Sequence, residues 1–237
     1  QKAKPQKRET RPVSKSVAKG AAKRVVLAAT QSDGLLVLGM HRSGTSLLAG
    51  LIAELGVSQF GVQPMERRPD NRDGFFEDRQ VVKMNDEILS SMVSSWDCPP
   101  SAPEVNWRTS DPSVRRLLLQ AREAVFQLRE DNVGPWFIKD PRISVLLDLW
   151  QKILLAPTPV VAIVRNPLDV AVSLLNRDDL PRKRSLALWY RYNHLLVSSI
   201  HRHKNIVVDY SKMCSEPNTL QAGLTKFLEQ SLVRRDG

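Results

Sequence analysis

The amino-acid sequence predicts one α/β domain in which helices flank a central parallel sheet, giving three layers. Two features indicate this class. Short apolar runs of strand length alternate with longer amphipathic stretches, as in βαβ units, and polar turns follow several of these runs. With 237 residues, the chain is long enough for one such domain with a full core but too short for two large ones.

The first half of the domain is expected to begin with a buried strand at 35–38, an uninterrupted apolar run. A helix over 45–55 follows it. The segment 58–76 is rich in Gly, Pro, Asp and Asn, which predicts an irregular excursion over the surface. Two helices are then predicted, one from near Glu77 and one from about Ser113, because apolar residues recur at helical spacing after each position.

The second half contains the clearest strand. The segment 98–112 has four prolines and is predicted to be a loop. A short strand at 136–138 and a helix over 143–154 follow. The run Val160–Val164 is interrupted only by a small alanine, which strongly predicts a strand. A last strand is expected at 206–208, and a final helix carries Leu220, Leu224, Phe227 and Leu228.

The positive charge of the chain is concentrated at its start. The formal net charge is +10, and residues 1–24 alone hold nine Lys/Arg and one Glu. We therefore predict a flexible basic tail or linker at 1–33 and one folded domain at 34–237. The tail has no aromatic residues for base stacking, so no specific nucleic-acid partner is expected. Because the chain begins with Gln1, one expectation is that it is part of a longer polypeptide.

Several classes of protein are disfavoured by composition. No apolar run approaches the ~20 residues that cross a bilayer, so we expect no transmembrane segment and a cytoplasmic location. The two cysteines, Cys98 and Cys214, fit a reducing compartment, although a single bridge between them stays open. The four histidines lack partners at metal-ligand spacing, so no metal site is expected.

The first predicted strand leads directly into the segment Gly39–Ser46, which reads Gly-Met-His-Arg-Ser-Gly-Thr-Ser. Both glycines of the P-loop pattern GxxxxGK[ST] are present, and its lysine is absent. Such a loop binds phosphate with backbone amides at a helix N-terminus. Here the positive charge is Arg42. The motif predicts an anion-binding loop in a three-layer fold similar to that of P-loop NTPases, whereas the plainer alternative is an ordinary glycine-bounded turn.

A second polar group, Arg165–Ser173, follows the strongest strand. Asn166 is a good helix N-cap and Pro167 suits the first turn. Ser173 returns to the helix face of Asn166 two turns later, so Arg165 and Ser173 are placed to hold one phosphate from two sides. The alternative for Arg165 is a surface ion pair.

Two further groups contain candidate catalytic residues. Lys139–Arg142 follows a predicted strand at the sheet edge where ligands collect in open α/β sheets. In Asp73–Asp78, Glu77 comes directly after two aromatic residues. Burial against them would raise its pKa toward the range of a general base. The alternative for Glu77 is a first-turn acid that stabilises the helix dipole.

Taken together, these motifs resemble those of the sulfotransferases that use 3′-phosphoadenosine 5′-phosphosulfate. The form His-Arg-Ser-Gly-Thr-Ser is more similar to bacterial members than to animal cytosolic enzymes, which usually have Pro-Lys-Ser-Gly-Thr-Thr. The resemblance extends from about Leu35 to Leu228. It implies transfer of a sulfuryl group to an acceptor hydroxyl without a metal.

The resemblance also implies a role for individual residues. Arg42 matches the basic residue that contacts the 5′-phosphosulfate, and Lys139 resembles a second transition-state cation. Arg165 and Ser173 match the pair that binds the 3′-phosphate, and Tyr210 matches a tyrosine near the adenine. The remaining donor-binding positions form the 5′-phosphosulfate loop and helix start: Ser43, Gly44, Thr45 and Ser46.

Glu77 matches the catalytic base of the glutamate-containing branch, with Asp140 and Asp73 as second choices. This branch acts on glycans and tyrosylproteins, and a carbohydrate is the acceptor we expect. His41 replaces the family's proline and is expected to pack in the loop. Two other functions stay open: a P-loop kinase or NTPase, which the absent lysine disfavours, and a non-catalytic module of a larger glycosyltransferase.

Overall fold

The computed structural model describes residues 32–61, 63–65, 75–101, 112–130 and 134–232. The predicted tail at 1–33 lies almost wholly outside these residues, so it stays a prediction. Only its last two residues, Ser32 and Asp33, are described, and both are buried. Among the described helices, none is both long enough and apolar enough to pass through a membrane.

The described residues form one parallel sheet of five strands in the order β2-β3-β1-β4-β5. The strands are β1 (Gly34–Leu38), β2 (Ser58–Gln59), β3 (Trp136–Lys139), β4 (Val160–Val164) and β5 (Asn205–Asp209). Every residue of β1 is buried, because β3 and β4 pair with its two edges and helices cover both faces. The sheet extends from β1 to β3 and β2 on one side and to β4 and β5 on the other, and open α/β sheets bind ligands at such a switch point.

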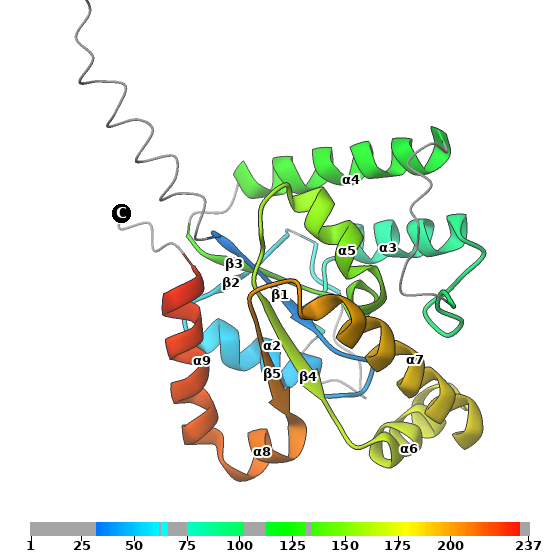
Figure 1. Cartoon of the computed structure of the whole chain (residues 1–237), viewed down its shortest axis with the longest axis vertical. Helices are drawn as coiled ribbons and strands as arrows, with labels where there is room; N and C mark the ends of the chain where they lie inside the picture. Colours follow the sequence, from blue (N-terminus) through cyan, green and yellow to red (C-terminus); the bar gives the residue numbers. More distant parts are fainter. Residues whose placement is uncertain (1–31, 62, 66–74, 102–111, 131–133, 233–237) are drawn as a thin grey trace, which may run out of the picture.

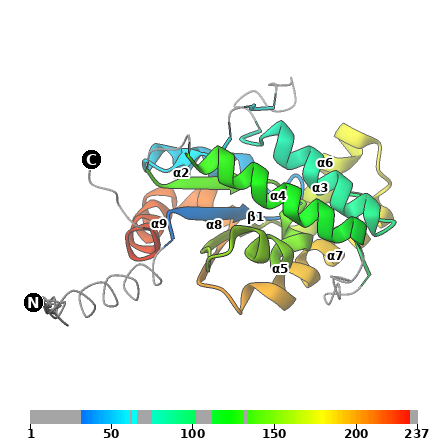
Figure 2. The same cartoon turned by 90° about the horizontal axis from the view of Figure 1, so that it is seen from above.

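Helices lie on both faces of this sheet (Figures 1 and 2). On one face, α2 (Thr45–Glu54) and α9 (Pro217–Ser231) pack buried leucine and isoleucine side chains against β1, and α8 (Tyr210–Ser215) lies beside them. The opposite face is covered by α3 (Arg79–Ser91), α4 (Pro112–Glu130), α5 (Ile143–Leu154), α6 (Pro167–Asp178) and α7 (Arg182–Ile200). The structure confirms the predicted three-layer fold.

The strongest patterns predicted their elements to the residue. The helix Ile143–Leu154 and the strand Val160–Val164 have the expected bounds. Asn166 caps α6 as predicted, because its side chain accepts a hydrogen bond from the amide of Leu168. Cys98 and Cys214 are both exposed free thiols, so the bridge between them that the sequence left open is absent.

One expectation was wrong, and one element was missed. Residues 58–59, which were expected to be irregular, form β2 because Ser58 pairs with Trp136 at the edge of the sheet. The helix expected from near Glu77 is confirmed; it begins at Arg79, since Asp78 is its N-cap and accepts hydrogen bonds from two amides. The short helix α8 was not predicted at all.

Candidate active site

The loop after β1 owes its shape to two glycines. Gly39 has φ +150° and Gly44 has φ +91°, a left-handed value that favours glycine. A Cβ at Gly44 would lie 2.5 Å from the ring of Tyr210. The start of the loop is fixed to α5, because the Gly39 amide donates to Ser144 Oγ (2.9 Å) and this hydroxyl donates back to the Gly39 carbonyl (3.1 Å). The start of the turn is therefore held in place by contacts within the fold.

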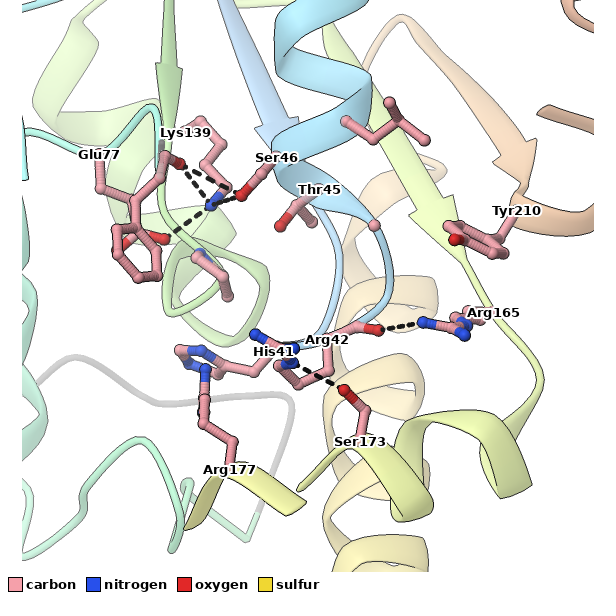
Figure 3. Close-up of a pocket in the computed structure, with 14 residues that line it drawn as sticks. His41, Arg42, Thr45, Ser46, Glu77, Lys139, Arg165, Ser173, Arg177 and Tyr210 are labelled. Atoms are coloured by element: carbon pink, nitrogen blue, oxygen red, sulfur yellow. Dashed lines mark hydrogen bonds and ion pairs between the residues drawn. The ribbon is translucent and has the colours of Figure 1, made fainter. Parts of the chain in front are cut away.

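Arg42 connects this loop with the residues that follow β4. Its Nε donates to Ser173 Oγ at 2.8 Å, and Arg165 Nη1 donates to the Arg42 carbonyl at 3.2 Å. The Arg165 guanidinium lies 4.3 Å above the centre of the Tyr210 ring, a cation–π contact. Residues of two sequence motifs, 123 or more positions apart, thus meet with Tyr210 at one place (Figure 3). Arg165 Nε also lies 3.7 Å from Asp169 Oδ2, so the ion pair that the sequence left open is present beside these contacts.

Lys139, at the end of β3, is buried and uses its ammonium group to join three segments. It donates to Glu77 Oε1 (2.7 Å), to the Phe75 carbonyl (2.8 Å) and to Ser46 Oγ (3.2 Å). Between the first two acceptors, Phe76 adopts a left-handed φ of 53°, which is costly for an aromatic residue. The lysine therefore holds a strained turn against the first turn of α2.

Glu77 is almost wholly buried, and this desolvation raises its pKa above the ordinary glutamate value. The adjacent Lys139 opposes the rise, while the carboxylate of Asp140 adds to it. Because Glu77 precedes the N-cap of α3 and pairs with Lys139, it does not act as a first-turn acid of the helix. Glu77 instead lines a cavity. Its raised pKa suits a general base that removes a proton from a bound ligand.

Asp140, the second choice for a base, has a structural position instead. It is fully buried, and it accepts hydrogen bonds from Asn85 Nδ2 and from the amide and Nη1 of Arg142. Asn85 in turn accepts a bond from Trp150 Nε1 at 2.7 Å. Asp140 does not line the cavity. Asp73, the other alternative, lies outside the described residues.

His41 packs in the loop as expected, with its ring edge-on to Trp96 (5.0 Å between centroids) and to Tyr192 (5.7 Å). Burial lowers its pKa well below the ordinary value, and the charges of Arg142 and Arg177 lower it further. The imidazole is therefore neutral at physiological pH. It adds no positive charge to a region that already contains several cations.

These side chains surround one cavity of about 190 Å³ (Figure 3). Four of its lining residues are cations, and one is a carboxylate: Arg42, Lys139, Arg165, Arg177 and Glu77. Ser46 and Lys139 lie with Glu77 at one end, and Arg165 lies with Tyr210 at the other. Such an excess of positive charge attracts an anion into the cavity, and Glu77 can accept a proton beside it.

Known proteins that are similar to this chain indicate its family and its fold. A family model described as the sulfotransferase family matches residues 34–233. The chain belongs to the sulfotransferase family. The fold is shared with the sulfotransferase domain from the curacin biosynthetic pathway, at a TM-score of 0.52 and 13% identity over 86% of this chain and 76% of that one. A sulfotransferase from Alicyclobacillus acidocaldarius aligns with a TM-score of 0.45 and 16% identity, over 84% and 83%. No curated protein gave a significant match.

The cavity of this sulfotransferase contains most of the residues that the sequence singled out. Glu77, Lys139 and all of the proposed donor-binding residues except Ser43 line it. Ser43 is a buried residue of the loop, and its hydroxyl has no hydrogen-bond partner among the described residues.

Sequence reasoning missed Asn85, Ser144 and the role of Arg177 as a lining residue. Asn85 could have been found, because it is a polar residue on the apolar face of a predicted helix, between Val81 and Leu89. Ser144 gave no signal of this kind, since its partner Gly39 is 105 positions away.

Proposed function

We propose that this sulfotransferase moves a sulfuryl group from 3′-phosphoadenosine 5′-phosphosulfate to an acceptor hydroxyl, with a carbohydrate as the favoured acceptor class. The observation that supports it most is the meeting of the Gly39–Ser46 loop with Arg165 and Ser173 at a cavity whose far end holds Lys139 and Glu77. This arrangement offers two separated anion sites and a base.

In the proposed complex, the two ends of the donor bind at different places. The loop amides and the N-terminus of α2 would hold the 5′-phosphate, where helix dipole and amide donors both favour an anion. Arg165 and Ser173 would hold the 3′-phosphate. The ring of Tyr210, already beneath the Arg165 guanidinium, would lie beside the adenine.

The proposed reaction is an in-line displacement at sulfur. The acceptor oxygen bonds to sulfur while the bond from sulfur to the 5′-phosphate oxygen breaks. Glu77 takes the proton of the attacking hydroxyl, and the leaving oxygen stays on adenosine 3′,5′-bisphosphate. Arg42 and Lys139 would neutralise the charge that develops on that oxygen and on the sulfuryl group. Since these cations serve the leaving group, we expect turnover to persist when magnesium is chelated.

Nucleotide selectivity tests the donor assignment by calorimetry. Adenosine 3′,5′-bisphosphate should bind more tightly than ATP or ADP. The Arg165→Ala change should weaken it about 10- to 100-fold, because a charge-assisted hydrogen bond is lost. Arg182→Ala serves as the matched control, since Arg182 is exposed and does not line the cavity. Preference for ATP would instead favour a P-loop kinase or NTPase.

Catalysis is tested separately by donor consumption over a panel of hydroxylated acceptors. Arg42→Ala should lower turnover about 10²- to 10³-fold, as expected when one preorganised donor to the transition state is removed. Unchanged turnover would remove Arg42 from the mechanism. Tight donor binding with no transfer to any acceptor would favour the non-catalytic module of a larger protein.

A further inference from the structure

Arg177 lines the cavity but has no part in the donor site proposed above. It lies in the last turn of α6, four residues after Ser173, and its side chain is 22% exposed. Its Nε donates to Asp178 Oδ2 at 2.6 Å. No hydrogen bond of its two terminal nitrogens is found within the described part of the chain. Two strong donors therefore stay available at the cavity wall.

The position of Arg177 along α6 separates it from Arg165, the cation of the proposed 3′-phosphate site, whereas Ser173 lies one turn before it. α6 begins at Pro167, two residues after Arg165, and ten residues at 1.5 Å of rise put Arg177 roughly 15 Å further along the axis than Pro167. In Figure 3, Arg177 lies beside His41 on the same side of Arg42 as Glu77, whereas Arg165 and Tyr210 lie on the other side. Glu77 lies at the upper left of this view and Arg177 at the lower left, so the guanidinium is on the side of the cavity away from Arg165, where an acceptor that reaches Glu77 would extend.

The surroundings hold Arg177 in place but leave its charge available on the cavity side. The guanidinium lies 5.6 Å from the centre of the Trp96 ring, which restricts its movement. His41, its neighbour in the wall, is neutral and brings no negative charge. The carboxylate of Glu77 is already paired with Lys139. The ion pair with Asp178 uses only Nε, so a neutral acceptor would leave the two terminal nitrogens of this cation without an oxyanion.

We propose that Arg177 is a specificity-determining residue that binds an oxyanion of the acceptor, so that the substrate carries a carboxylate, phosphate or sulfate in addition to the hydroxyl that is modified. The planar guanidinium suits bidentate recognition of these groups. The inference rests on the proposed function, because it takes the Glu77 end of the cavity as the acceptor end.

Binding to the complex with adenosine 3′,5′-bisphosphate tests this inference without requiring turnover. The protein is saturated with that nucleotide and titrated with methyl β-D-glucuronide, glucose 6-phosphate and methyl β-D-glucoside. At least one of the two anionic sugars should bind about 10- to 100-fold more tightly than the glucoside. Which of them binds identifies the oxyanion as carboxylate or phosphate.

Variants then assign the preference to one side chain. Arg177→Gln should abolish the preference while changing the affinity for the nucleotide less than twofold, and Arg177→Lys should restore part of it. Arg182→Gln, an exposed arginine outside the cavity, is the matched control. Equal binding of all three sugars, no binding of any, or a loss of nucleotide affinity in Arg177→Gln would each overturn the inference. Failure of the proposed function is distinguishable, since the wild-type protein would then not bind adenosine 3′,5′-bisphosphate.

Discussion

Removing the buried ammonium of Lys139 should destabilise the fold more than any surface charge change. In Lys139→Met the side-chain volume is nearly kept, but Glu77 remains as a buried carboxylate without its cation. Breaking a buried ion pair in this way costs about 3–5 kcal/mol. For a domain of this size, each kcal/mol lowers the melting temperature by about 2–4 °C. We therefore expect a decrease of about 6–20 °C at pH 8, measured by thermal unfolding.

Two controls separate the charge effect from a general loss of packing. Lys83→Met removes a lysine whose ion pair with Glu87 is exposed and 3.8 Å long, so it should leave the melting temperature unchanged within error. The double variant Lys139→Met with Glu77→Gln leaves no unpaired charge, so it should regain a clear part of the lost stability. The reasoning is refuted if Lys139→Met is as stable as the wild type or if the double variant is no better than Lys139→Met.

The pH dependence of this deficit has a definite sign. Burial raises the pKa of Glu77, and loss of Lys139, which lowers that pKa, raises it further. A carboxyl group with a raised folded-state pKa favours folding at low pH, and this contribution is lost as the pH rises from the unfolded value through the folded one. The stability difference between Lys139→Met and the wild type should therefore shrink between pH 8 and pH 5.

Two other changes test the base and the loop. The transfer rate should decrease as the pH falls through the pKa of Glu77, at a midpoint above the ordinary 4.5, because the base becomes protonated. Glu77→Gln should remove this limb of the pH profile and lower kcat about 10²- to 10⁴-fold; an unchanged profile would exclude Glu77 as the base. Gly44→Ala places a Cβ against Tyr210 at φ +91°, and it should weaken nucleotide binding as well as cost roughly 1–3 kcal/mol of stability. Gly56→Ala is its control, with φ +87° and no atom within 4 Å, and equal effects of the two changes on nucleotide affinity would contradict the role of the loop.

The elements that the sequence predicted well are those with long local patterns. The helix at 143–154 and the strand at 160–164 bury most of their side chains, so the apolar pattern that marks them is long and clear. β2 consists of two residues, and it is a strand only because Ser58 pairs with Trp136, 78 positions later. A local sequence pattern cannot indicate pairing between residues so far apart in the chain. This explains why β2 was missed.

The same distinction applies to the site. The rule that ligands bind at the carboxyl ends of parallel strands was enough to group the Gly39 loop, Lys139 and Arg165. It could not predict that Glu77 pairs with Lys139, because this contact depends on how the turn at Phe76 brings a segment outside the sheet over α2. Arg177 gave no signal because one arginine on the polar side of an amphipathic helix is ordinary, and only its neighbours in space distinguish it.

The three hydrogen bonds of Lys139 also link ligand binding at the carboxyl end of β3 to the segment 75–77, which lies outside the nucleotide loop. A ligand oxygen that attracts this ammonium must replace the Ser46 hydroxyl, the Phe75 carbonyl or Glu77 as an acceptor. If either of the last two is released, the turn at Phe76 can relax toward an ordinary backbone conformation. The amide of Met65, which donates to the Glu77 carbonyl at 2.8 Å, would then exchange its proton faster and report occupancy from outside the cavity.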